Sequence, residues 1–269
     1  MKRACRICFF YQMCYNIYCK IIRRHRRERI YKMKLSVLGI NGPFPAPGGA
    51  CSGYLLSSDS GNTNILIECG AGILARMTRF IDIHSLSGIV LSHLHYDHMS
   101  DMLPMHYLLQ FNKLARNIPV ICPKEPQTTR MLIENDQLDL IEPESITVGE
   151  MRLSFTPSVH PVPGVSVRVE CDGRTFVYTG DTNMHPGLEL FCDGADLLLA
   201  DAGLTSAQWS ETAPHLSAKL CGQVAKNCRA GALILTHIRP GNDPEALLDE
   251  ARAEYPGAVL AHAGSSYII

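Results

Sequence analysis

The sequence predicts an α+β fold in which helices pack on the outer faces of β-sheets. After Met33, short apolar, β-rich runs alternate with helical segments in both halves of the chain. A stretch containing only strands opens the second half, and several strands end in a polar residue with the chemistry of a metal ligand. Because the apolar face of a sheet needs a covering layer, the helices are expected outside the sheets. The 269 residues, 46% of them hydrophobic, suffice for one large domain or two small ones.

In the first half, a strand opens the pattern and a loop with three prolines between residues 41 and 50 follows it. Prolines at this density exclude regular structure. Strands are expected at Leu35–Ile40, Tyr54–Ser57, Asn64–Glu68, Gly88–Leu91 and Val120–Cys122. Helices are expected at Ala71–Phe80, Met102–Leu114 and Gln127–Asn135.

In the second half, four strands in succession precede a return to alternating strands and helices. Strands are expected at Ile146–Val148, Arg152–Thr156, Val165–Glu170, Thr175–Tyr178, Asp196–Ala200, Ala232–Leu235 and Ala258–Leu260. Helices are expected at Gly187–Phe191, Ser217–Asn227 and Pro244–Glu254. No internal repeat and no apolar run long enough to span a membrane follows residue 32.

The first 32 residues differ in composition from the rest of the chain. Of the 25 Lys and Arg and 26 acids, ten bases and one acid lie here, so residues 33–269 carry a net charge of −10. The pair Cys5–Cys8 has zinc-site spacing, but the other two cysteines of the segment are loosely placed, and no cleavage site of a secretory signal follows. We expect a basic, Cys-containing extension over 1–32 that is either disordered or, if translation begins at Met33, not translated. The domain then spans 33–269.

The acidic balance of residues 33–269 argues against general nucleic-acid binding, which needs a basic face. Seven cysteines lie in this part without paired spacing, and several stand beside apolar residues. Cysteine in such positions usually behaves as a small hydrophobe. An odd, unpatterned set is typical of a reducing compartment. We therefore expect a cytoplasmic protein.

The densest group of candidate ligands is the run His-Leu-His-Tyr-Asp-His at residues 93–98, which follows an apolar strand. It places three of the 11 histidines and one carboxylate within six positions. Imidazole and carboxylate together suit a borderline cation such as Zn²⁺. One loop could therefore supply ligands to two ions. The alternative is a solvated, histidine-rich turn, which the rest of the chain disfavours.

Three later strands each end in one further candidate ligand. These residues are His160, Asp181 and His237, and Gly180 permits a sharp turn before the second. Rigid strands that present polar side chains on loops are a common way to build a precise site. Taken singly, each histidine is typical of a surface residue and the Thr-Gly-Asp run of a turn. Together with the motif at 93–98, the set favours a metal site.

This order of ligands resembles the pattern of the metallo-β-lactamase-fold hydrolase superfamily. The resemblance covers about residues 33–269 and implies a four-layer αββα sandwich with a metal site along one edge of its two sheets. It implies one ion bound by His93, His95 and His160, a second bound by Asp97, His98 and His237, and Asp181 as the bridge between them.

The resemblance implies two Zn²⁺ ions as cofactor. Two divalent ions about 3.5–4 Å apart need a shared anion, and a water between them is acidified toward neutral pH and becomes a nucleophile. Loss of Asp97 is therefore expected to abolish turnover. Superfamily members that bind iron for redox work usually carry an acid at the position of His95. The histidine at this position favours a zinc-dependent hydrolase, with Mn²⁺ or Fe²⁺ as alternative ions.

Two further residues narrow the class. Asp201 follows the expected strand at 196–200, and His215 precedes a helix that Ser217 could cap. From Ala195 onward, the sequence resembles the ribonuclease Z branch, in which an acid and a histidine flank the leaving group. The resemblance implies that Asp201 orients His215 and that His215 donates a proton or stabilises the phosphoryl oxygens. The alternative is that His215 is only an N-terminal helix residue.

One departure from ribonuclease Z concerns the substrate. That enzyme carries a long tRNA-gripping arm between the lone His and the lone Asp. Here His160 and Asp181 are 21 positions apart, which leaves room only for two strands and a turn at 171–173. Processing of tRNA 3′ ends is therefore disfavoured, and no stable nucleic-acid partner is expected. A small phosphodiester, such as a cyclic nucleotide or a short oligonucleotide, is favoured.

The sequence thus predicts a dinuclear zinc-dependent phosphodiesterase acting through a metal-bridging hydroxide. Hydrolysis of a lactone, ester or thioester on the same fold is the alternative. Hydrolysis of β-lactams is typically a secreted activity and is disfavoured. A non-enzymatic metal-binding module is disfavoured because all seven ligands are present. A homodimer is expected, since proteins that this chain resembles are commonly dimeric.

Overall fold

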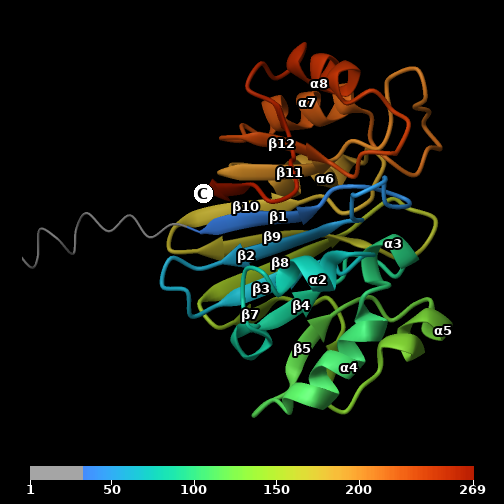
Figure 1. The fold of residues 1–269 in the computed structure, drawn as a ribbon. Coiled ribbons are helices and arrows are strands. Elements are labelled where there is room, and N and C mark those ends of the chain that lie inside the picture. Colours follow the sequence, from blue (N-terminus) through green and yellow to red (C-terminus); the bar gives the residue numbers. More distant parts are fainter. Residues whose placement is uncertain (1–32) are drawn as a thin grey trace, which may run out of the picture. The chain divides into compact units, whose positions relative to one another are not determined.

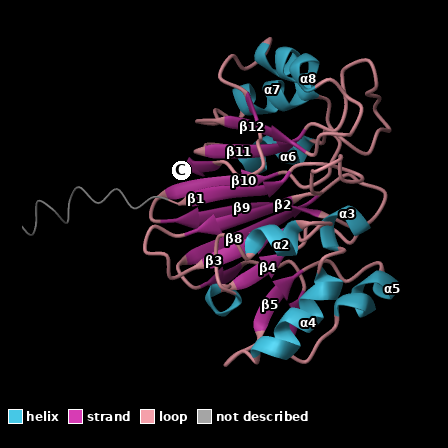
Figure 2. Ribbon diagram, viewed as in Figure 1, coloured by secondary structure: helices cyan, strands magenta, loops and turns pink. Residues whose placement is uncertain are grey.

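The computed structural model describes residues 33–269, which form two seven-stranded sheets with helices on their outer faces (Figure 1). The predicted N-terminal extension, residues 1–32, lies outside the described residues. Figure 2 shows the strands of both sheets between the helices. This arrangement confirms the predicted α+β class and the αββα sandwich.

The first sheet combines an antiparallel part with a parallel part. Its strands are, in spatial order, β14 (Ser266–Ile268), β1 (Lys34–Gly39), β2 (Gly53–Ser57), β3 (Asn64–Ile67), β4 (Gly88–Val90), β5 (Ile118–Ile121) and β6 (Leu138–Ile141). The strands from β3 to β6 run parallel. The outer face is covered by α2 (Ile73–Met77), α4 (Met102–Asn112) and the 3-10 turns η1 (Ile83–Ser85) and η2 (Met131–Ile133).

The second sheet has the same mixed construction. Its strands are, in spatial order, β13 (Val259–Leu260), β12 (Leu233–Thr236), β11 (Leu197–Asp201), β10 (Arg174–Tyr178), β9 (Val165–Cys171), β8 (Met151–Pro157) and β7 (Ile146–Val148). The strands from β10 to β13 run parallel. The outer face is covered by α6 (Pro186–Cys192), α7 (Ala218–Asn227) and α8 (Pro244–Arg252).

Both faces of the central strands are buried, so these strands read as continuous apolar runs. In β11, Leu197 and Leu199 face the core between the sheets, whereas Leu198 packs toward the helices. Successive side chains of a strand point to opposite faces, which explains this division. A hydrogen bond of 2.6 Å between Tyr54 Oη and Thr236 Oγ1 joins the two sheets.

The seven cysteines of residues 33–269 are all buried and unpaired. They contribute to the apolar layers, as Cys221 within α7 and Cys228 directly after it do on the second sheet. Burial raises the pKa of the Cys51 thiol to about 11 and that of Cys69 well above its ordinary value. A thiol that stays protonated packs as a small hydrophobe, as the sequence predicted. Among the described residues, no helix is long and apolar enough to cross a membrane.

Several short elements differ from the expectations. The helix expected at 71–80 is limited to Ile73–Met77, because Gly72 precedes it in a left-handed conformation with φ 88°. The helix expected at 127–135 divides into α5 (Gln127–Arg130) and the 3-10 turn η2. Four elements were not expected: α3 (Tyr96–Met99), β6, β14 and the 3-10 turn η1. Each has four residues or fewer and carries no repeating apolar pattern.

The segment between the second-sheet strands β8 and β10 is short, as expected. Only the hairpin of β9 and β10 lies between His160 and Asp181, apart from the flanking loops. Its turn places Asp172 and Gly173 at positive φ, 51° and 77°, which matches the twist of the strands. The chain therefore has no long arm at this point.

The core between the sheets can be tested with a matched pair of leucine variants. Leu199→Ala should lower the free energy of unfolding by about 2–5 kcal/mol, because it leaves a cavity at a fully buried position. Leu190→Ala, at a side chain that is 80% exposed, should change it by less than about 0.5 kcal/mol. Urea-induced unfolding followed by circular dichroism measures both. Equal losses would contradict the described core.

Candidate metal centre

The polar residues predicted at strand ends meet at one edge of the two sheets. The motif at residues 93–98 follows β4, His160 follows β8, Asp181 follows β10 and His237 follows β12. Strands β8, β10 and β12 run in the same direction, because β8 and β10 are both antiparallel to β9 and β12 is parallel to its neighbour. Their carboxyl ends therefore lie at the same edge.

The three residues of the first predicted ligand group lie close together. His93, His95 and His160 could hold a metal ion together. Nδ1 of His95 lies 3.0 Å from Nε2 of His93 and 3.1 Å from Nε2 of His160. His93 is buried and the other two are half-buried, so this group faces the accessible side of the cluster. The carbonyl of Pro214 lies 3.0 Å from Nδ1 of His160 and orients that ring.

The second predicted group lies deeper. Asp97, His98 and His237 are all buried and could hold a metal ion together. Oδ2 of Asp97 lies 3.4 Å from Nε2 of His98 and 3.3 Å from Nε2 of His237. His237 has a positive φ of 57°. A non-glycine residue adopts this left-handed conformation only infrequently.

Asp181 lies between the two groups. Its Oδ2 is 3.2 Å from Nε2 of His237, 3.3 Å from Nε2 of His98 and 3.8 Å from Nε2 of His93. The carboxylate is buried and contacts imidazoles of both groups. This is the position that a bridging carboxylate would need.

The polar atoms of the cluster fit divalent transition-metal ions. Nε2 of His98 and Oδ1 of Asp181 are buried without a hydrogen-bond partner among the described residues. Leaving a buried polar atom unsatisfied costs about 1–3 kcal/mol. Cations coordinated here would satisfy these atoms. Imidazole nitrogens and carboxylate oxygens are ligands that Zn²⁺ prefers.

The electrostatics of the cluster favour the binding of cations. Burial lowers the pKa of His93 well below its ordinary value, so the ring is neutral. Burial by itself raises the pKa of Asp97, but His98 and His237 outweigh it and the pKa falls below its usual range. Burial lowers the pKa of His237, yet the carboxylate of Asp181 raises it to about 10. A cation bound at His237 would displace that proton.

Sequence reasoning missed Glu68, which supports the cluster from behind. Glu68 is fully buried after β3 and has a positive φ of 63°. Its carboxylate accepts hydrogen bonds from the backbone N–H of Ser92, at 3.1 and 3.3 Å, and its Oε1 lies 3.4 Å from Nδ1 of His98. Partners of this kind orient metal-binding histidines. The sequence did contain a signal for this role, because Glu68 is an acid directly after the apolar run at 65–67, as the predicted ligands are after their strands.

The structure also brings Asp201 and His215 to the cluster. Nδ1 of His215 lies 2.8 Å from Oδ2 of Asp201, and Oδ1 of Asp201 accepts from the N–H of Gly203. Burial by itself lowers the pKa of His215, but the carboxylate of Asp201 outweighs burial and raises it. Nδ1 of His215 is also 3.7 Å from Oδ2 of Asp181. The pair is therefore a positioned proton donor beside the candidate metal ligands.

All nine residues predicted for the site thus lie within one cluster at the sheet edge. The seven predicted ligands form three of the groups able to hold an ion, and Asp201 and His215 complete a fourth with Asp181 and His237. Ser217, the predicted helix cap, accepts a hydrogen bond from the N–H of Leu220 at 3.3 Å. His215 therefore stands two residues before the cap, in the preceding loop and outside α7.

Comparison with known proteins places this architecture in a family. Residues 63–238 match the family model of the beta-lactamase superfamily domain. The probable metallo-hydrolase YhfI of Bacillus subtilis is 28% identical over 235 residues, which cover 84% of this chain and 96% of that protein. Its crystal structure has a TM-score of 0.83 and covers 89% of this chain and 100% of that chain.

Two further relatives are named for other activities. A ribonuclease Z of Haloferax volcanii is 26% identical in an alignment 291 positions long that covers 84% of this chain and 91% of that protein. The crystal structure of a diphosphatase from the PhnP family is 19% identical and shares the fold, with a TM-score of 0.68 over 88% of this chain and 97% of that chain. The chain therefore belongs to the beta-lactamase superfamily domain family and is a metallo-hydrolase of the β-lactamase fold.

Proposed function

We propose that this metallo-hydrolase is a dinuclear zinc-dependent phosphodiesterase that acts on a small phosphodiester, such as a cyclic nucleotide or a short oligonucleotide. The observation that carries the proposal is the pair of Asp201 and His215, held at 2.8 Å beside the candidate metal ligands. The similarity to a ribonuclease Z, an enzyme of nucleic-acid chemistry, supports the same reaction class.

In this proposal, His93, His95 and His160 would hold one ion, Asp97, His98 and His237 would hold the other, and Asp181 would be the ligand shared by the two groups. When bound, two such ions supply an acidified water as nucleophile and polarise a phosphoryl oxygen. Mn²⁺ or Fe²⁺ are alternatives to Zn²⁺ with the same ligands. Glu68 holds His98 in position through Nδ1, so that Nε2 points into the cluster.

His215 supplies the proton that the leaving group needs. Departure of an alkoxide from phosphorus is slow unless its oxygen is protonated or its charge is stabilised. Nδ1 of His215 is fixed by Asp201, so Nε2 is the nitrogen available to the substrate. The carboxylate of Asp201 raises the pKa of His215 above its ordinary value, which favours the protonated ring. Asp201 is a positioning residue, because it acts through His215.

The scale of the site favours a small substrate. Only the hairpin of β9 and β10 lies between the two ligands that flank the tRNA-gripping arm of ribonuclease Z. The net charge of −10 over residues 33–269 disfavours a stable nucleic-acid partner. We propose the cytoplasm as the place of action, in keeping with the seven buried, unpaired cysteines of the described residues.

A carboxylic ester, lactone or thioester hydrolase is the second candidate function. The same metal-binding residues would serve attack on a carbonyl carbon, and the leaving group would also need a proton. The acid–histidine pair favours the phosphodiester, because it adds a cationic donor beside the position of the phosphoryl oxygens. A metal-binding module without catalysis is disfavoured by the presence of this pair.

We also propose that the protein is a homodimer joined through the exposed face of α4. This 11-residue helix has no charged residue, and Leu103, Tyr107 and Phe111 form an exposed stripe along it. Tyr107 and Phe111 are 67% and 82% exposed. The adjacent 3-10 turn η2 packs against α4 and exposes Met131 and Leu132 as well.

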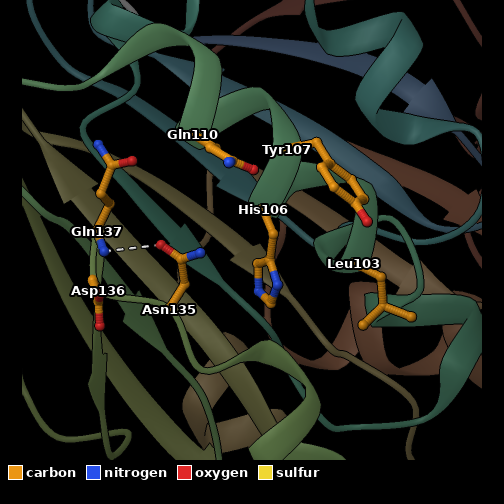
Figure 3. Close-up of a pocket in the computed structure, with 7 residues that line it drawn as sticks. All are labelled: Leu103, His106, Tyr107, Gln110, Asn135, Asp136 and Gln137. Carbon is orange, nitrogen blue, oxygen red and sulfur yellow. Dashed lines mark hydrogen bonds between the residues drawn. The ribbon is translucent and has the colours of Figure 1, made fainter.

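A second copy of the chain fits this surface better than a charged partner. Together the five side chains expose on the order of 500 Å² of apolar area, which approaches the ~800 Å² per partner of a standard interface. Depletion of charge is typical of the centre of an interface. Beside the stripe, a hollow of about 550 Å³ runs between α4 and residues 135–137, with Tyr107 and His106 on its wall (Figure 3).

The reaction class can be tested with a substrate panel. The zinc-loaded protein should hydrolyse bis-p-nitrophenyl phosphate and should not turn over lactones or thioesters, because His215 and Asp201 favour the phosphodiester. Initial rates measured by absorbance decide between the two. Turnover of lactones or thioesters with no hydrolysis of the phosphodiester would reject the proposed activity and select the second candidate.

Two substitutions separate the chemistry from the binding of metal. His215→Ala should lower kcat about 10²–10⁴-fold, the usual contribution of a general acid, while the metal content stays unchanged. Asp97→Ala should abolish turnover and reduce the metal content. Steady-state kinetics and elemental analysis of the same samples measure both effects. Loss of metal from His215→Ala would place that ring among the ligands, and full activity of Asp97→Ala would refute the metal mechanism.

The dimer proposal can be tested by light scattering after size-exclusion chromatography. The wild-type protein should have twice the 29.7 kDa mass of the chain. Phe111→Asp should be a monomer, because it places a charge in the apolar contact. Leu190→Asp, at another highly exposed leucine on α6, should remain a dimer. A monomeric wild-type protein, or a dimer of Phe111→Asp with unchanged stability, would contradict this surface.

A further inference from the structure

A cavity of about 290 Å³ adjoins the candidate metal centre and shares His237 with it. It is lined by Gly42, Pro43, Gly203, Leu204, Pro214, His215, His237 and Arg239. His215 is the proposed proton donor, so the cavity lies on the side from which the leaving group departs. This orientation of the substrate in the cavity rests on the proposed phosphodiesterase function.

The walls of the cavity are apolar and lie close to the catalytic histidines. Pro43, Leu204 and Pro214 provide its apolar surface. Gly42 approaches the imidazole of His237 so closely that an added Cβ would collide with the ring, and a Cβ on Gly203 would lie 3.3 Å from Cγ of His215. The two glycines therefore let the loops at 42–43 and 203–204 come close to the imidazoles of His237 and His215.

Among the lining residues, Arg239 is the only lysine or arginine. Its guanidinium has no hydrogen-bond or ion-pair partner among the described residues, and its side chain is exposed. Its backbone is fixed, because the neighbouring Ile238 donates to the carbonyl of Ile40 at 2.7 Å and accepts from Gly42. The structure thus holds a free guanidinium at the rim of a small apolar slot.

We propose that this cavity binds the nucleobase of the substrate and that Arg239 recognises the base. A base has two flat, weakly polar faces and hydrogen-bond acceptors along its edge. Proline and leucine side chains suit the faces, and a guanidinium can stack on a base or donate two hydrogen bonds to its edge. The volume lies at the small end of ligand pockets, which favours a single base over a longer oligonucleotide.

The alternative ligand for Arg239 is a second phosphate group. A phosphate would be bound in solvent by an arginine or a lysine alike, since it needs mainly positive charge. The cavity next to Arg239 is mainly apolar, however, and a doubly charged phosphate would lose hydration against Pro43 and Leu204. The apolar walls therefore favour the base.

Equilibrium binding of two probes to the zinc-loaded protein tests the proposal without turnover. AMP carries a base and a phosphate, whereas ribose 5-phosphate lacks the base. Isothermal titration calorimetry should show that the wild-type protein binds AMP at least tenfold more tightly than ribose 5-phosphate. Arg239→Met should weaken AMP binding about tenfold and leave ribose 5-phosphate unchanged. Arg239→Lys should behave like Arg239→Met, because an ammonium has no planar face.

A matched control is Arg79→Met, at another exposed arginine without a side-chain partner among residues 33–269 and outside this cavity. It should bind both probes as the wild type does. Equal binding of the two probes, or no binding of AMP, would overturn the base subsite. An Arg239→Met variant that loses both probes while Arg239→Lys keeps them would assign the guanidinium to a phosphate. Base-dependent binding without phosphodiester turnover would reject the proposed function and leave the subsite standing.

Discussion

The structure depends on the contact of one buried carboxylate, Asp181, with imidazoles that come from different loops. Its Oδ2 lies within 4 Å of His93, His98 and His237. Burying several imidazoles and carboxylates together costs free energy, because buried charges need partners and buried polar atoms need hydrogen bonds. The unsatisfied atoms of His98 and Asp181 show that the side chains of the described residues alone do not complete the cluster. Divalent cations would complete it, and the proposed hydrolysis follows from that requirement.

The two sheets supply the rigidity that this cluster needs. Parallel strands β3 and β4 in one sheet, and β10 to β12 in the other, end at the same edge and aim their following loops at one point. The hydrogen bond between Tyr54 and Thr236 couples the sheets one residue before His237. Apolar layers on both faces hold the strands in place. The strain at Glu68 and His237, both at positive φ, is thus carried by the fold that surrounds them.

Much of this could be predicted from the sequence, because the strands and the ligands have local patterns. The strand at 146–148 has the predicted bounds, and the nine predicted site residues lie in one cluster. Elements without such a local pattern were not predicted. The edge strands of the first sheet, β6 and β14, are defined by backbone pairing to a neighbouring strand. The helix α3 is a single turn that contains the predicted ligands Asp97 and His98 and has no helical repeat of apolar residues. The role of Glu68 depends on its contact with His98, a residue far along the chain, which no local pattern records.

The zinc content of the purified protein tests the central claim most directly. Elemental analysis of protein equilibrated with Zn²⁺ and freed of unbound ions should give two zinc ions per chain. Asp181→Asn should bind fewer than two, because the amide cannot serve both groups of ligands. A wild-type protein that retains no zinc, or a single ion that is unaffected by Asp181→Asn, would contradict a two-ion site organised around this carboxylate.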